Sequence, residues 1–186
     1  MNVKSALAKP FAQYVHSRIK KGMHQALEHQ DALFKSLLKV GAKTQFGKDH
    51  RLGEASDAPS FREAVPIRDY EAFKPYIEQI KAGKDNVLWK GKPIYFAKTS
   101  GTTSGVKYIP ITKDSIPNHI LSARNALLCY MAETGNTAFA NGRLIFLSGS
   151  PELARTGNIP TGRLSGIVNH HVPAYLRSNQ LPSYAT

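Results

Sequence analysis

The sequence predicts an α/β fold in which N-terminal helices precede part of a mixed or parallel sheet flanked by helices. Residues 5–21 and 24–40 carry apolar side chains at three- and four-residue spacing, which predicts two helices. A strand–loop–strand–helix–strand order follows over residues 94–148, and this order is typical of α/β layers. At 186 residues, the chain is long enough for one domain with a sizeable core.

The two N-terminal helices are predicted from their apolar stripes. Pro10 suits the first turn of a helix, so the first helix is expected to begin near residue 9. His24 and His29 do not have the spacing of a helical zinc site and are expected on the surface. The stripes consist of Leu7, Phe11, Tyr14 and Val15 in the first helix, and of Leu27, Leu33, Phe34, Leu37 and Leu38 in the second.

A polar loop is predicted for residues 41–59. Ser60 and Glu63 have the spacing of a capping box, but Pro66 limits any helix there to about one turn. Asp69 is the expected N-cap of the next helix, which Pro75 should break or kink.

The next segments are predicted to be strands around a helix. Short β-prone runs indicate strands at residues 87–89, 94–97 and 107–111, and Pro110 places the last of these at a sheet edge. A helix over residues 115–134 should begin at Asp114 and end at Gly135. The continuous apolar run 143–148 predicts a buried strand of a parallel sheet. Residues 149–186 are rich in glycine and proline and are expected to form a loop-rich, poorly packed end.

Composition narrows the class of protein. The hydrophobic share of 41% is ordinary for a globular chain. Cys129 is the single cysteine, so an intrachain disulfide framework is excluded and a reducing cytoplasm fits. No apolar run approaches the roughly 20 residues of a membrane-spanning helix. The net charge of +12 is spread along the chain without a known nucleic-acid motif, so it is interpreted as a solvated basic surface.

The most informative stretch is the loop between the predicted strands, residues 99–107. Gly101 and Gly105 allow positive φ, hydroxyl side chains add hydrogen-bond donors, and Lys107 adds a point charge. Such a loop can form a nest of backbone N–H groups that binds an anion such as a triphosphate. Its glycine spacing excludes a Walker A motif. An ordinary glycine- and serine-rich turn is the alternative interpretation.

The loop and its flanks resemble a known family. Residues 99–107 resemble the phosphate-binding loop of adenylate-forming enzymes. Residues 65–71, 75–77 and 108–112 narrow the resemblance to the Gretchen Hagen auxin-responsive family of acyl-acid amido synthetases, and to its bacterial members in particular. The resemblance runs from about the second helix to the C-terminus. It implies the N-terminal portion of an adenylate-forming domain.

The resemblance implies a ligase that uses ATP and Mg²⁺. A carboxylic acid would become an acyl-adenylate, and an amino acid would then attack it to form an amide. Small molecules are the expected partners, without nucleic acid or stable membrane insertion, and the expected location is the cytoplasm. Lys107 would act catalytically by neutralising phosphate charge. The implied ATP-binding residues are Thr99, Ser100, Gly101, Thr102, Thr103, Ser104, Gly105 and Lys107.

Other site residues carry less specific patterns. In the family, loops after the strand at 143–148 help to line the acid pocket, so Ser148 and Ser150 are candidates. Arg163 could meet a carboxylate or a phosphate. His170 and His171 are adjacent and make a poor metal site, so no metal ligand is assigned.

The family's later motifs, which hold adenine, ribose and the metal-binding glutamate, do not occur in this sequence. The 186 residues are therefore expected to be a truncated, single partial domain that does not turn over in isolation. Three alternatives stay open. They are a non-catalytic fragment that binds nucleotide or a partner protein, an enzyme resembling acyl-CoA ligases, and a basic domain associated with nucleic acid.

Overall fold

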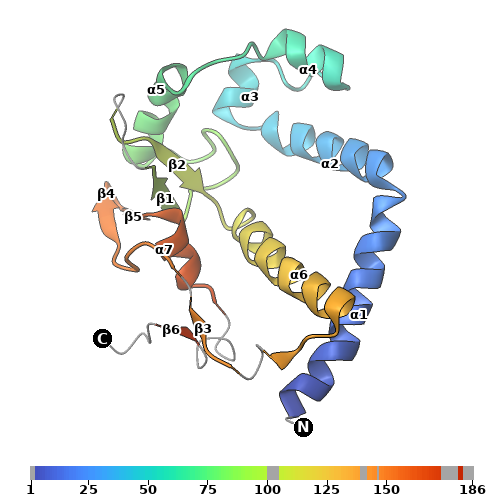
Figure 1. Cartoon of the computed structure of the whole chain (residues 1–186). Coiled ribbons are helices and arrows are strands. Elements are labelled where there is room, and N and C mark those ends of the chain that lie inside the picture. Colours follow the sequence, from blue (N-terminus) through green and yellow to red (C-terminus); the bar gives the residue numbers. More distant parts are fainter. Residues whose placement is uncertain (1–2, 100–104, 139–141, 146, 173–179, 182–186) are drawn as a thin grey trace. The chain divides into compact units, whose positions relative to one another are not determined.

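The computed structural model describes residues 3–99, 105–138, 142–145, 147–172 and 180–181 (Figure 1). The chain divides into two compact units. Unit 1 comprises Met1–Ala26, Asp114–Pro151 and Ser165–Thr186, and unit 2 comprises Leu27–Lys113 and Glu152–Leu164. Among the described residues, no helix is long and apolar enough to cross a membrane.

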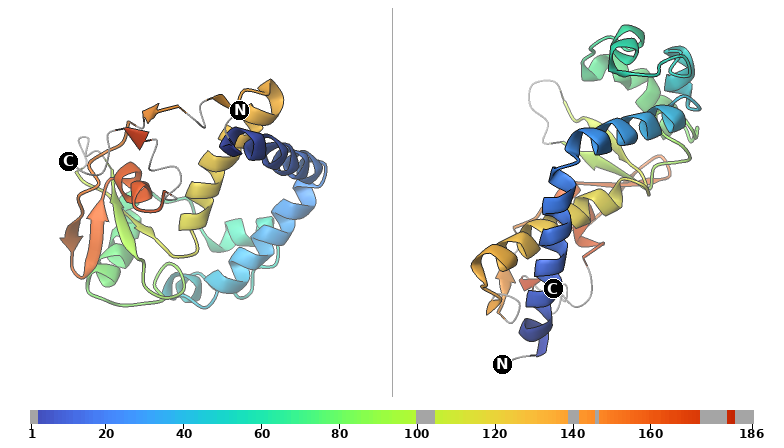
Figure 2. Two further views of the ribbon diagram at one scale, coloured as in Figure 1. Left: turned by 90° about the horizontal axis from the view of Figure 1, so that it is seen from below. Right: turned by 90° about the vertical axis from the view of Figure 1, so that its right-hand side faces the viewer.

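Unit 1 is built on two long helices, α1 (Val3–Met23) and α6 (Ile116–Thr134), which cross and pack against each other (Figures 1 and 2). Their shared core contains Ala12, Leu128 and Met131. Because alanine is small, the two helix backbones can approach closely at this point. At the end of α6, Gly135 adopts a left-handed φ of 69° and its N–H donates to Met131 O, as its predicted role as a terminator requires.

Several predictions for these two helices are wrong. Helix α1 begins at Val3, so Pro10 lies inside it rather than in its first turn. Most of the expected stripe is exposed, with Leu7 at 66% and Tyr14 at 58% exposure, because α1 packs on α6 through Ala8 and Ala12, and Val15 is the one residue of the stripe that joins this contact. The N-cap position of α6 is Ser115 rather than Asp114.

The rest of unit 1 contains short elements. Strand β3 (Leu144–Ile145) pairs in parallel with β6 (Gln180–Leu181), and α7 (Leu164–Asn169) buries Ile167 completely. A strand with a parallel partner within 143–148 is confirmed, but its predicted burial is wrong, because Ile145 and Leu147 are 68% and 93% exposed.

Unit 2 begins with four helices: α2 (Ala26–Gly41), α3 (Gln45–Asp49), α4 (Ala58–Ala64) and α5 (Tyr70–Lys81). His24 and His29 are exposed, as predicted. On α2, only Leu38 of the predicted stripe is buried, whereas Leu27, Leu33 and Leu37 are exposed.

The predicted loop at 41–59 instead contains α3 and the first residues of α4. Thr44 caps α3, since its side chain accepts a hydrogen bond from the Gly47 N–H at 3.0 Å. Asp57 caps α4 and forms a reciprocal capping box with Ser60. Ser60 thus occupies the N3 position of that box rather than its N-cap.

A four-stranded mixed sheet of order β2-β1-β5-β4 completes unit 2. Strand β1 (Tyr95–Lys98) pairs antiparallel with β2 (Tyr108–Ile111) and parallel with β5 (Ile159–Gly162), which pairs antiparallel with β4 (Ala154–Thr156). The α/β class with a mixed sheet is confirmed. Pro110 lies in an edge strand, as predicted, whereas residues 87–89 are not a strand.

The core of unit 2 lies between α5 and the sheet. Its buried members are Tyr76, Ile77, Ile80, Val87, Phe96 and Ile159. Helix α5 runs unbroken through Pro75, which corrects the predicted break. Asp69 caps α5, as predicted, because its Oδ1 accepts a hydrogen bond from the Ala72 N–H at 3.1 Å.

The segment 149–186 is more regular than the sequence predicts. Its described residues include β4, β5, α7 and β6. Thr161 and Ile167 are almost fully buried. Pro160 and Gly162 lie within β5, and Gly157 has a φ of +58° in the turn between β4 and β5.

Candidate functional site

The predicted phosphate loop connects the antiparallel strands β1 and β2. At its base, the Thr99 N–H donates to Lys107 O at 3.1 Å, and the Lys107 N–H donates to Thr99 Oγ1 at 3.3 Å. The two ends of the loop are therefore held together by the backbone and by the threonine hydroxyl. Ser100, Gly101, Thr102, Thr103 and Ser104 lie outside the described residues.

Gly105 and Lys107 form the second end of the loop. Gly105 has a φ of +82° and open space where a Cβ would stand. Such a position favours glycine and leaves the main chain open to a ligand. Lys107 is half-buried, and its Nζ lies 5.7 Å from the centre of the Tyr70 ring, within cation–π range.

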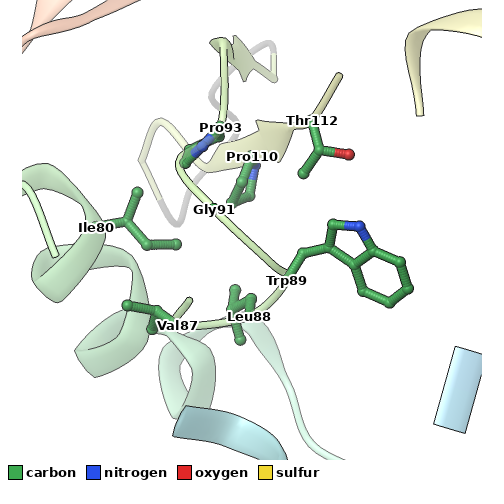
Figure 3. Close-up of a pocket in the computed structure, with 8 residues that line it drawn as sticks. All are labelled: Ile80, Val87, Leu88, Trp89, Gly91, Pro93, Pro110 and Thr112. Carbon is green, nitrogen blue, oxygen red and sulfur yellow. The ribbon is translucent and has the colours of Figure 1, made fainter. Parts of the chain in front are cut away.

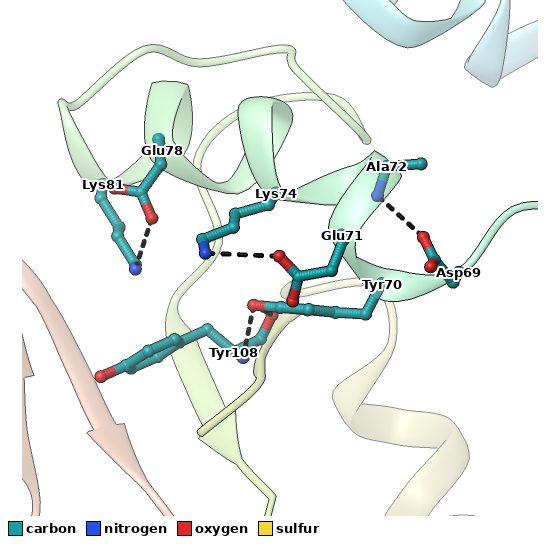
Figure 4. Close-up of polar contacts among 8 residues, drawn as sticks. All are labelled: Asp69, Tyr70, Glu71, Ala72, Lys74, Glu78, Lys81 and Tyr108. Carbon is teal, nitrogen blue, oxygen red and sulfur yellow. Dashed lines mark hydrogen bonds and ion pairs between the residues drawn. The ribbon is translucent and has the colours of Figure 1, made fainter. Parts of the chain in front are cut away.

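Tyr70 connects the start of α5 to β2 directly after the lysine. Its Oη accepts a hydrogen bond from the Tyr108 N–H at 2.8 Å and lies 3.5 Å from Tyr108 O (Figure 4). Sequence reasoning identified Asp69 as the cap but missed Tyr70. No sequence signal could have revealed its role, because Tyr70 and Tyr108 are 38 residues apart.

The Tyr108 ring is held in turn by two neighbours. Lys81 Nζ lies 4.1 Å from its centre, and Phe96 meets it edge-on at 5.8 Å. Lys81 also pairs with Glu78 at 2.8 Å. Both α5 and the sheet therefore fix the first residue of β2 (Figure 4).

Arg163 follows β5 at the same edge of the sheet at which the loop follows β1. Strands β1 and β5 are parallel, and Ala97 lies opposite Gly162. The carboxyl ends of parallel strands share one edge, where ligands bind in open α/β sheets. Arg163 is exposed there. The structure therefore brings the cations of Lys107 and Arg163 to the carboxyl ends of two neighbouring strands.

Ser148 and Ser150 belong to unit 1, whereas Thr99, Lys107 and Arg163 belong to unit 2. Ser148 Oγ accepts a hydrogen bond from Asn169 Nδ2 at 2.7 Å. The carbonyl oxygen of Ser150 stands where a Cβ at Gly166 would lie, so α7 packs closely on this loop. Their predicted role in an acid pocket stays a prediction.

A second tyrosine of α5 makes a hydroxyl hydrogen bond to α3. Tyr76 Oη donates to Asp49 Oδ2 at 2.9 Å. Burial raises the pKa of Tyr76, and hydrogen bonds from Gln45 and Tyr76 lower the pKa of Asp49. This bond joins two helices and involves none of the loop residues.

A small pocket of about 220 Å³ lies elsewhere in unit 2 (Figure 3). Among the residues that the structure describes, no residue of the predicted phosphate loop lines it, and none of its lining residues is charged. It suits an apolar group rather than a phosphate. Its lining residues are Ile80, Val87, Leu88, Trp89, Gly91, Pro93, Pro110 and Thr112.

A metal site would require ligating side chains close together in the described part of the chain. There, no group of three or more His, Cys, Asp or Glu side chains could hold a metal ion. No protein ligand is assigned to the implied Mg²⁺ among these residues.

Comparison with known proteins decides the family. Residues 15–184 match the model of the GH3 family N-terminal domain. The chain belongs to the GH3 family. The predicted resemblance to the Gretchen Hagen (GH3) family is thereby confirmed.

Two plant GH3 proteins illustrate the relationship. The chain is 26% identical over 133 residues to the jasmonoyl–L-amino acid synthetase GH3.5 of Oryza sativa subsp. japonica, covering 70% of this chain and 22% of that protein. It is 32% identical over 93 residues to the indole-3-acetic acid-amido synthetase GH3.15 of Arabidopsis thaliana, covering 49% of this chain and 16% of that protein. The chain spans 14% to 23% of the length of the curated relatives it matches.

The fold of a solved GH3 protein agrees. The structure described as GH3.15 acyl acid amido synthetase superposes with a TM-score of 0.71 at 20% identity. The match covers 84% of this chain and 28% of that one. The described fold is therefore that of the N-terminal region of GH3 proteins.

Proposed function

We propose that this chain carries the ATP phosphate-binding part of an acyl acid amido synthetase. The observation that carries the proposal is the hydrogen-bonded base of the loop at Thr99 and Lys107, beside Arg163, in a chain of the GH3 family. Relatives named as jasmonoyl–amino acid and indole-3-acetic acid-amido synthetases support a small carboxylic acid and an amino acid as substrates. The lone cysteine, Cys129, supports a reducing cytoplasm as the site of the reaction.

The proposed chemistry has two steps. A carboxylate oxygen attacks the α-phosphorus of ATP, the bond from that phosphorus to the bridging oxygen breaks, and pyrophosphate leaves. The amine nitrogen of an amino acid then attacks the acyl carbon, loses a proton and displaces AMP. Neither step needs a protein nucleophile, so the protein supplies positioning and charge stabilisation.

The loop residues would divide these tasks. Backbone N–H groups of Ser100 to Gly105 would bind the β- and γ-phosphates, with hydroxyls from Thr102 and Thr103. Lys107 would neutralise developing charge as a point cation, and Arg163 would receive a phosphate or the substrate carboxylate. Mg²⁺, when bound to the phosphates, would neutralise further charge. No ligand of this ion is assigned to the described residues.

A non-catalytic, nucleotide-binding role for the 186-residue chain alone is the second candidate. The observation in its favour is that the chain spans no more than 23% of the length of its curated relatives. On either candidate, we expect the isolated chain not to catalyse acid-dependent ATP–pyrophosphate exchange. Exchange at a normal rate would contradict this expectation.

Calorimetric titration with ATP tests the proposed class of function. We expect saturable binding of ATP, and binding of duplex DNA that is weak. If ATP does not bind, and DNA binds with a steep dependence on salt, a basic nucleic-acid-associated domain replaces the proposal.

A further inference from the structure

We propose that Tyr70 is a positioning residue for Lys107, and that it aims the lysine ammonium before a phosphate arrives. The inference rests on the proposed function of the loop and deepens it. The hydroxyl of Tyr70 holds the backbone directly after the lysine, and its ring holds the ammonium.

The first observation concerns the backbone groups of β2 that point away from β1. Thr99 and Lys107 form a hydrogen-bonded pair of the hairpin, so the next pair, Lys98 and Tyr108, is not hydrogen-bonded across the strands. The N–H and C=O of Tyr108 therefore face away from β1. Pro110 faces the same way and has no N–H, so Tyr108 presents the outward donor of this strand.

The Tyr70 hydroxyl takes the place of a neighbouring strand at this edge. It accepts the Tyr108 N–H at 2.8 Å and lies near the Tyr108 carbonyl oxygen. A buried or half-buried backbone donor without a partner destabilises its segment, so this hydroxyl fixes the start of β2. Lys107 directly precedes Tyr108, so its backbone is held in place as well.

The second observation is the ring itself. Its centre lies 5.7 Å from Lys107 Nζ. A ring face attracts a cation without neutralising it, in contrast to a carboxylate. The ammonium is thus held in place while its charge stays available to a phosphate.

The third observation is that Tyr70 is itself anchored. It is the first residue of α5, which Asp69 caps. Tyr76, Ile77 and Ile80 bury the same helix in the core of unit 2. Because α5 is fixed in the core, Tyr70 can hold Lys107 in one place.

Matched variants test the inference with inorganic tripolyphosphate as the probe. Tyr70→Phe removes the hydroxyl and keeps the ring, and Tyr70→Leu removes both. Tyr76→Phe is the control, since it removes a hydroxyl hydrogen bond from the same helix. We expect Tyr70→Phe to weaken binding about 3- to 10-fold, from the loss of one hydrogen bond. Tyr70→Leu should weaken binding further, and Tyr76→Phe should leave it within about twofold.

A double-mutant cycle distinguishes positioning of Lys107 by Tyr70 from a general loss of structure around the loop. If Tyr70 acts through Lys107, Tyr70→Phe should have no further effect on binding in the Lys107→Met background. Without ligand, the Tyr108 amide should exchange faster with solvent in Tyr70→Phe than in Tyr76→Phe. If Tyr70→Leu does not fold, the double-mutant cycle of Tyr70→Phe with Lys107→Met alone tests whether Tyr70 acts through Lys107.

The outcomes separate the two proposals. Absence of tripolyphosphate binding by the wild-type chain overturns the proposed function and this inference with it. Two results overturn the inference alone when the wild type binds and Lys107→Met binds more weakly. One is a Tyr70→Phe variant that binds tripolyphosphate as tightly as the wild type. The other is a Tyr70→Phe change that weakens binding equally in the wild-type and Lys107→Met backgrounds.

Discussion

Ala97 of β1 and Gly162 of β5 lie opposite each other in parallel register. The chain leaves both strands at the same edge, towards the phosphate loop after β1 and towards Arg163 after β5. Lys107 and Arg163, which are 56 residues apart in sequence, thus contribute cationic side chains to one edge of the sheet. Each consequence of this arrangement can be measured on the 186-residue chain.

Replacement of Arg163 should weaken phosphate binding. We expect Arg163→Gln to lower the affinity for tripolyphosphate about fivefold, because a charge-assisted contact is lost. Arg155→Gln on β4 removes the same charge from the same unit and is the control, with an expected change below about twofold. Equal losses in both variants would show that net charge alone is sensed.

Substitution of Gly157 should destabilise unit 2. This residue has a φ of +58°, and an added Cβ would lie 2.5 Å from Lys81 O. We expect Gly157→Ala to lower the free energy of unfolding by about 1–3 kcal/mol in urea titrations. Gly53→Ala is the control, since Gly53 has open space around it. A neutral Gly157→Ala would contradict the close approach of this turn to α5.

Two isoleucines give a matched pair for the core. Ile77 is 2% exposed beneath the sheet, whereas Ile67 is fully exposed before α5. We expect Ile77→Ala to lower the free energy of unfolding by about 2–5 kcal/mol, and Ile67→Ala to change it by less than about 0.5 kcal/mol. Similar values in the two variants would be incompatible with the described core.

The ion pairs of Glu133 should make unit 1 sensitive to acid. Lys20 first, and His16 second, lower the pKa of Glu133 below its ordinary value of 4.5. The folded state therefore favours the carboxylate, so its stabilising effect is complete above that value and disappears as the pH falls through the lowered pKa. Glu133→Gln should lower the urea midpoint at pH 7.

Urea titrations of the same two proteins at lower pH test this ionic contribution. The difference between wild type and Glu133→Gln should shrink between about pH 5 and pH 3. Glu28→Gln, a change of the same charge at an exposed position of α2, is the control. A difference that stays constant down to pH 3 would rule out the ionic contribution.

Much of the fold could be predicted because local chemistry determines it. The N-cap at Asp69, the glycine terminator at Gly135 and the edge position of Pro110 each follow from one side chain and its own backbone. The hairpin around the loop was predictable because both of its strands are short β-prone runs. The family resemblance then predicted a phosphate site at the loop, and this role stays a prediction.

The missed features depend on tertiary structure. Helices α3 and α4 have five and seven residues, too few to show a helical apolar period, and their caps at Thr44 and Asp57 stand within a polar segment. Helix α5 tolerates Pro75 on its exposed face, where the Glu71 carbonyl left without a helical partner can meet water. The contact of Tyr70 with Tyr108 arises only when α5 packs beside the edge strand.

Comparison of ATP with AMP tests directly whether the loop binds the β- and γ-phosphates. If the loop binds the β- and γ-phosphates through Lys107, the wild-type chain should bind ATP more tightly than AMP. Lys107→Met should weaken ATP binding about tenfold while changing AMP binding little, and Lys113→Met, the exposed control, should change neither. Equal affinity for ATP and AMP, or an ATP affinity that Lys107→Met leaves unchanged, would contradict the account.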